Sequence, residues 1–129
     1  MFGTQGYAAA SRRYAAIDAG SKVEGATPHQ LVKILYDELM LAIEAAALAM
    51  RANDAHKARD KQTRALTMLH ALESSLDHDK GGDIAENLAL IYRETRRRVL
   101  AAVSDNDPDR AMGAHAIIAD IAEAWARIG

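Results

Sequence analysis

The sequence predicts an all-α protein, an antiparallel up-down-up-down four-helix bundle with a flexible N-terminal arm. Three observations lead to this prediction. Half of the residues are hydrophobic but only 5% are aromatic, and alanine supplies much of the rest, which favours helices packed through small side chains. Apolar residues recur at three- and four-residue spacing in four segments. Helix-start signals stand at the head of each segment.

Composition limits the class of partner. A chain of 129 residues fits one domain with one core. Cysteine is absent, which removes disulfides and thiolate metal sites and favours a reducing compartment. Lys plus Arg number 16 against 18 for Asp plus Glu, too balanced to attract nucleic acid broadly. Asp37, Glu38 and Glu44 interrupt the longest apolar stretch, and no signal peptide is recognisable. We therefore expect a cytosolic protein that binds neither nucleic acid nor membrane.

Residues 1–26 differ from the rest of the chain. Glycines are scattered there among Ser, Thr and Ala, with few sizeable apolar groups. This composition predicts a partly disordered arm or cap, with one short helix around Tyr14.

The first bundle helix is expected to start at Thr27. Thr27 can cap it, Pro28 suits the first helical position, and Gln30 can complete a capping box. The helix should end near Asn53, a rod of roughly 37 Å at 1.5 Å per residue. Its inward line is Leu31, Leu35, Leu39, Ala42, Ala46 and Ala49.

The next two helices have similar signals. Asp54 can cap the second helix, which should stop before Gly81-Gly82, and Asp83 with Glu86 predicts the start of the third. The inward line of the second is Ala58, Ala65, Leu69, Leu72 and Leu76. The inward line of the third is Ile84, Leu88, Ile91, Thr95, Val99 and Ala102.

The fourth helix is predicted from Asp107 as cap and Pro108 in the first turn, and it should run nearly to Gly129. Its inward line is Ala111, Ala114, Ile118, Ala122 and Trp125. Because the connections are short, consecutive helices must be antiparallel neighbours. Residues 27–129 are thus expected to form the bundle.

Catalytic and metal sites are not predicted. Di-iron bundles need Glu-x-x-His pairs, which do not occur here, and the five histidines are dispersed. No cofactor and no enzymatic activity are expected. One alternative is a histidine-phosphotransfer-like signalling bundle using His70, because the residues around it superficially resemble that motif. However, Glu73 stands where that family has a lysine, and Ser74 replaces its glycine, so the electrostatics oppose phosphate.

Apolar residues exceed what a bundle core needs, since a core-facing stripe is only about 100° wide. The surplus residues are Ile34, Leu41 and Leu48 on the first helix, Leu90 on the third, and Ile117, Ile121 and Ile128 on the fourth. They predict a hydrophobic groove for a helix of a partner protein. Two alternatives stay open: the arm and neighbouring helices cover these residues, or they are buried between identical copies of the chain.

Three segments of the chain, residues 26–37, 80–92 and 121–125, closely resemble the flagellin-specific export chaperones of bacteria, the FliS family. The likeness extends from Tyr14 onward, in order and at similar spacing. It implies an antiparallel four-helix bundle that binds the carboxy-terminal segment of flagellin, prevents its premature polymerisation and delivers it to the flagellar type III export apparatus. The export gate and flagellin-regulating proteins would be further partners, and a homodimer of the free protein stays open.

The resemblance also implies site residues. Tyr14 matches the tyrosine of the family's amino-terminal arm, which caps the binding surface when no client is present. Other matches lie in the first-helix motif and the third-helix motif. Together with the surplus apolar residues, the expected partner-binding set is Tyr14, Gln30, Ile34, Tyr36, Asp37, Leu41, Asn87, Leu88, Leu90, Tyr92, Ile117 and Ile121.

Overall fold

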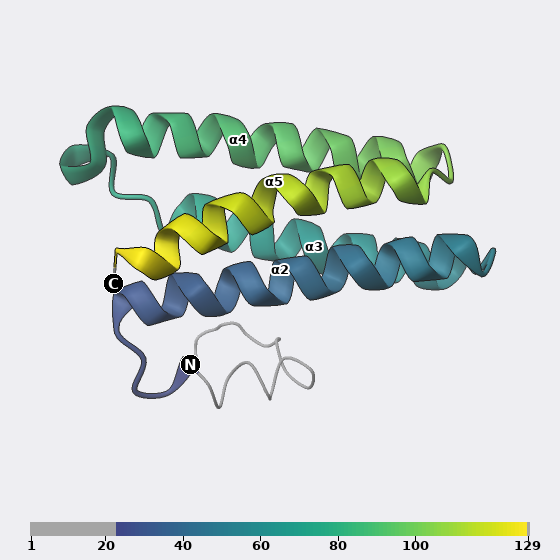
Figure 1. The fold of residues 1–129 in the computed structure, drawn as a ribbon, viewed down its shortest axis with the longest axis horizontal. Coiled ribbons are helices and arrows are strands. Elements are labelled where there is room, and N and C mark those ends of the chain that lie inside the picture. The colour runs from purple at the N-terminus through teal and green to yellow at the C-terminus, as the bar shows by residue number, and fades with distance from the viewer. Residues whose placement is uncertain (1–22, 129) are drawn as a thin grey trace.

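A computed structural model describes residues 23–128, which form four helices and no strand. The helices are α2 (Pro28–Arg51), α3 (Ala55–Ser74), α4 (His78–Ser104) and α5 (Pro108–Arg127). They form a ring in which α2 and α4 are diagonal and each contacts both α3 and α5 (Figure 1). The predicted all-α four-helix bundle is confirmed. Of the expected arm, residues 1–22 and thus Tyr14 lie outside the described residues.

Each helix begins with a cap supplied by the residue just before it. Thr27 Oγ1 accepts a hydrogen bond from the Gln30 N–H at 3.1 Å, and Gln30 Oε1 accepts from the Thr27 N–H at 2.9 Å, which completes the predicted capping box. Asp54, Asp77 and Asp107 each accept from the N–H three residues later. The starts of the four helices are therefore encoded locally.

The start of α4 differs from the prediction. Asp77, not Asp83, caps the helix, which begins at His78. Gly82 lies inside it at φ 50° and ψ −124°, a conformation that only glycine adopts readily, and it kinks the helix after its first turn. The kink changes which residues face inward. Ile84, predicted to be in the core, is 71% exposed, and Ala85 is buried in its place.

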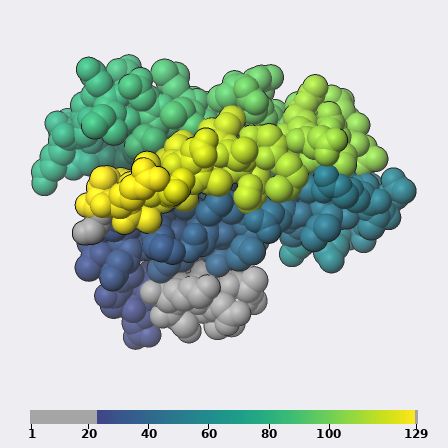
Figure 2. All heavy atoms as spheres, viewed as in Figure 1, coloured from purple at the N-terminus to yellow at the C-terminus, as the bar shows by residue number. Residues whose placement is uncertain are grey.

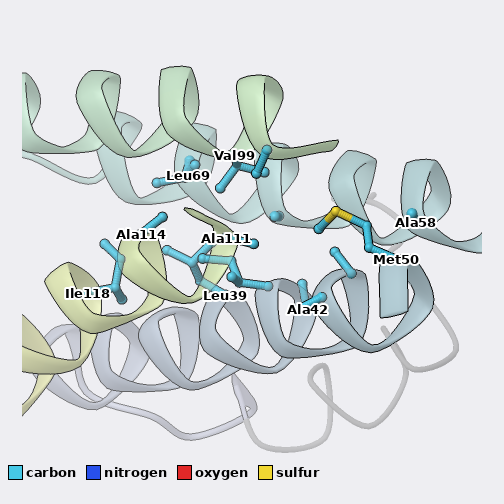
Figure 3. Packing of buried hydrophobic residues seen from close by; sticks show 14 of the residues in the cluster. Leu39, Ala42, Met50, Ala58, Leu69, Val99, Ala111, Ala114 and Ile118 are labelled. Atoms are coloured by element: carbon cyan, nitrogen blue, oxygen red, sulfur yellow. The ribbon is translucent and has the colours of Figure 1, made fainter. Parts of the chain in front are cut away.

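The core is a continuous cluster between the four helices, and alanines supply much of it (Figure 3). Small side chains let the helix axes approach closely. The helix α2 contributes most, with its large buried side chains Tyr36, Leu39, Ile43 and Met50. The predicted inward lines of α3 and α5 are buried or packed against this cluster, from Ala58 to Leu76 and from Ala111 to Trp125.

Two of the connections share one geometry. Asn53 at φ 58° and Asn106 at φ 51° adopt the left-handed conformation, and each precedes the aspartate that caps the next helix. Both turns lie at the end of the bundle opposite the start of α2 (Figure 1). They join α2 to α3 and α4 to α5 as tight antiparallel pairs.

Candidate partner-binding site

An open cleft of about 340 Å³ lies at the end of the bundle where α2 and α4 begin. We call it the Trp125 cleft. Residues of α2, α4, α5 and the turn between α3 and α4 line it, and most of the lining is apolar or aromatic. The lining residues are Val32, Tyr36, Ser75, Leu76, Asp77, Lys80, Gly81, Ile84, Ala85, Leu88, Tyr92 and Trp125.

Two glycines near the start of α4 shape one wall of the cleft. A Cβ atom on Gly81 would lie 2.9 Å from the Cβ of Ala85, a distance of approach that only glycine allows. The kink at Gly82 then places Ile84 at the rim of the Trp125 cleft. A large apolar side chain is thus left exposed where a partner can reach it.

Tyr36 and Tyr92 form the floor of the cleft. Their hydroxyl oxygens are 2.7 Å apart and their ring centroids 6.5 Å apart. Both side chains are almost fully buried, and burial is the main cause that raises the pKa of each phenol. One hydroxyl donates to the other in an apolar setting, so the pair holds α2 and α4 together across the diagonal of the bundle.

Trp125 closes the cleft from α5. Its indole N–H donates to the backbone oxygen of His29 at 3.0 Å, and its ring stacks on the His29 ring at a centroid distance of 4.5 Å. Its ring also meets Tyr36 edge-on at 6.4 Å. The last turns of α5 are thereby fixed to the first turn of α2, and an aromatic wall faces the Trp125 cleft.

The structure brings only part of the expected site together. Tyr36, Leu88 and Tyr92 line the Trp125 cleft, with the two tyrosines as buried floor. Leu41 on α2 and Leu90 on α4 are more than half exposed. Because α2 and α4 are diagonal, their outward faces point away from each other, and these two leucines do not line one groove.

The remaining expected residues are spread over the bundle. Gln30 is exposed and serves in the capping box, and Asp37 pairs with Lys33 at 2.9 Å. Asn87 is exposed on α4. Ile34, Ile117 and Ile121 are half-buried, so none of the surplus apolar residues is enclosed in the core.

Among the cleft residues that the sequence did not identify as site residues are four large apolar or aromatic ones: Val32, Leu76, Ile84 and Trp125. The spacing of Leu76, Ile84 and Trp125 along their helices predicts core positions instead. The neighbouring Gly81-Gly82 is the signal that could have found them, because a glycine pair inside a helical pattern marks a change of direction.

Two acidic side chains, Glu73 on α3 and Glu94 on α4, pair with arginines of α4. Glu73 on α3 accepts a hydrogen bond from Arg93 and lies 3.6 Å from Arg96, so the carboxylate near His70 is engaged with arginines of α4. Hydrogen bonds from Arg97 and Arg98 lower the pKa of Glu94 to about 2. In the same part of the chain, no group of three or more potential ligands could hold a metal ion.

No helix among the described residues has the length and apolarity needed to cross a membrane.

Comparisons with known proteins agree with one another. The profile of the protein family described as "Flagellar protein FliS" matches residues 10–129. The chain is 33% identical to the flagellar secretion chaperone FliS of Salmonella typhimurium over 118 residues, which cover 91% of this chain and 87% of the relative. It is 31% identical to the protein of that name from Escherichia coli over 116 residues, 89% of this chain and 85% of the relative. It is 24% identical to the flagellar secretion chaperone FliSB of Pseudomonas aeruginosa, over 90% of this chain and 92% of the relative.

Proposed function

This chain belongs to the FliS family of flagellar proteins, and we propose that it binds the carboxy-terminal segment of flagellin in the cytosol. It acts as a chaperone in flagellar export and is not an enzyme. In the proposed role it keeps flagellin from polymerising early and delivers it to the type III export apparatus.

The Trp125 cleft is the observation that supports this proposal. It joins an aromatic floor to an exposed apolar rim, and Tyr36, Leu88 and Tyr92 of the expected site meet there. Elsewhere on α2, Leu41 is 57% exposed and Leu48 is 66% exposed, so further apolar surface is accessible on the bundle. Such a surface suits the apolar face of a helix.

The physical reason for binding is that a short helix is unstable alone in water. Its nucleation cost is offset only when an apolar face is buried against a partner. A client segment that is disordered when free would therefore order on the bundle. Part of the interaction free energy is used in that ordering, which keeps the complex releasable.

Co-purification with flagellin tests the proposal. We expect full-length flagellin to be retained by this protein and flagellin lacking its last few dozen residues to be lost. Retention of the truncated flagellin would overturn the assignment of the client segment.

A pair of variants tests the site itself. Ile84→Glu places a charge at the exposed rim of the Trp125 cleft, and we expect it to weaken binding of a flagellin carboxy-terminal peptide about tenfold. His70→Gln, on the exposed surface of α3, is the control and should bind like the unchanged protein. Equal binding by the Ile84→Glu variant would remove the Trp125 cleft from the site and leave the chaperone role standing.

A further inference from the structure

A second and larger cleft lies at the opposite end of the bundle, between α3 and α4. We call it the α3–α4 cleft, and its volume is about 740 Å³. Asn53 and Asn106 of the two interhelical turns are among its lining residues. Figure 1 shows these turns at the end of the bundle away from the start of α2. Its lining residues are Met50, Asn53, Ala55, Ala58, Arg59, Gln62, Leu100, Val103, Ser104 and Asn106.

Small side chains on α3 leave this cleft open. Between Ala55 and Ala65, α3 buries only Ala58 and Ala65, whose small side chains cannot fill the space toward α4. On the facing side of α4, Leu100 is 40% exposed and Val103 is half-buried. Apolar surface thus remains accessible between two helices of one bundle, which is where helical segments of other proteins dock.

The rim of the α3–α4 cleft carries an unpaired cation. Among residues 23–128, Arg59 is the arginine without a carboxylate partner, and its guanidinium donates only to the backbone oxygen of Ala55 at 3.4 Å. The side-chain amides of Asn53, Gln62 and Asn106 make no hydrogen bond within the same described part of the chain. The rim therefore offers a cation and several free donors around an apolar floor.

We propose that the α3–α4 cleft binds an amphipathic helix of a second protein, with apolar side chains against Leu100 and Val103 and an Asp or Glu paired with Arg59. Ala55, Arg59 and Gln62 stand at i, i+4 and i+7, so they present two helical turns, about 10 Å, along one edge. That length suits a short helix laid between α3 and α4. An arginine that pairs with a carboxylate adds orientation as well as affinity, because its planar guanidinium can form two parallel hydrogen bonds.

This inference does not depend on flagellin binding, because the two clefts lie at opposite ends of the bundle and share no lining residue. Both clefts can be filled at once. The chain would then hold a client and a second protein together.

The test uses two synthetic helical peptides of about 15 residues, the shortest length at which helices form readily. Both carry leucines every three or four residues along one face. One has glutamates beside the leucines and the other has lysines at the same positions. We expect the glutamate peptide to shift backbone amide signals of the full-length protein at residues 55–62 and 100–106. Shifts elsewhere, or none, would overturn the proposal.

Charge-exchange variants distinguish specific binding in the α3–α4 cleft from nonspecific hydrophobic binding. Arg59→Glu should lower the affinity for the glutamate peptide about tenfold and raise the affinity for the lysine peptide by a similar factor. Leu100→Glu should weaken both peptides about tenfold, since it places a charge in the apolar floor. His70→Gln, which lies outside the α3–α4 cleft, is the control and should change neither.

Three further outcomes would count against the proposal. Equal affinity of the two peptides for the unchanged protein would remove the role of Arg59. Signal shifts at the same residues on raising the protein concentration alone would identify the cleft as a contact between copies of this chain. Release of the glutamate peptide by a flagellin carboxy-terminal peptide would show that the α3–α4 cleft is part of the flagellin-binding site. If the Leu100→Glu variant fails to fold, the Arg59→Glu exchange still decides the matter, because Arg59 is exposed.

Discussion

The hydroxyl oxygens of Tyr36 and Tyr92 lie 2.7 Å apart, although 56 positions separate the two residues in the chain. The contact joins α2 to α4, the two helices that are otherwise diagonal in the ring. Because both phenols are almost fully buried, each depends on the other for its hydrogen bond.

The first prediction concerns that hydrogen bond. Tyr92→Phe should lower the free energy of unfolding by about 1–3 kcal/mol, because the hydroxyl of Tyr36 is then left buried without this partner. The double change of Tyr36 and Tyr92 to Phe should cost less than the sum of the single changes. Urea unfolding of the four proteins measures this double-mutant cycle. Additive effects would mean that the two hydroxyls are not coupled.

The second prediction concerns high pH. Burial raises the pKa of Tyr36 and of Tyr92 above the ordinary value of 10.0, so the folded state holds its protons longer than the unfolded state. Their contribution to stability is complete below about pH 10 and is lost as pH rises above it. Urea unfolding should give similar stability at pH 7 and pH 9 and a decline above pH 10. The double Tyr to Phe variant should show a smaller decline, and an equal one would assign the effect to other groups.

The third prediction contrasts two glycines. Gly82 has a φ of 50°, so Gly82→Ala should destabilise the protein by about 1 kcal/mol. Gly113 lies within α5 with open space around its missing Cβ, so Gly113→Ala should stabilise it by about 0.5–1 kcal/mol. Thermal unfolding of both variants measures the direction of each change in stability. A loss of stability at Gly113 would contradict the packing described for α5.

The fourth prediction concerns Trp125. Trp125→Phe keeps an aromatic ring against His29 but removes the 3.0 Å hydrogen bond, which should cost about 1 kcal/mol. Trp125→Ala also removes the stacked ring and should cost about 2–4 kcal/mol, somewhat less than a fully buried tryptophan. Hydrogen exchange should show reduced protection of the backbone amides in the first turn of α2 and at the end of α5. Faster exchange spread evenly over α3 would argue against a local role.

Local signals explain why most of the fold was predictable. Thr27, Asp54 and Asp107 cap the helices that were expected to start there, because a cap acts through the few residues beside it. The α3–α4 turn was less predictable, since Asp77 and Asp83 are both competent caps. The helix begins after the first of them, and the kink at Gly82 redirects the residues that follow.

The site was predictable only in part, for a physical reason. Spacing along one helix shows that Ile84 or Leu90 is apolar, but it does not show which neighbour each one meets. The meeting of Tyr36 with Tyr92, and of Trp125 with His29, depends on how four helices pack around one another. Of the expected residues, Tyr36, Leu88 and Tyr92 line the Trp125 cleft, whereas Leu41 and Leu90 are exposed on other faces of the bundle.

The contact of Trp125 with the first turn of α2 brings the last described helix of the chain against the first one. Figure 2 shows α5 lying between α2 and α4 on one face, so the ring has no gap between its first and last described helices. An ion pair from Arg51 to Asp109 and a hydrogen bond between Glu44 and His115 lie along the same boundary. A circularly permuted gene, with a short linker from the end of α5 to Thr27 and new termini at Asn53, would retain these helix neighbours. Packing alone does not dictate where the polypeptide must begin.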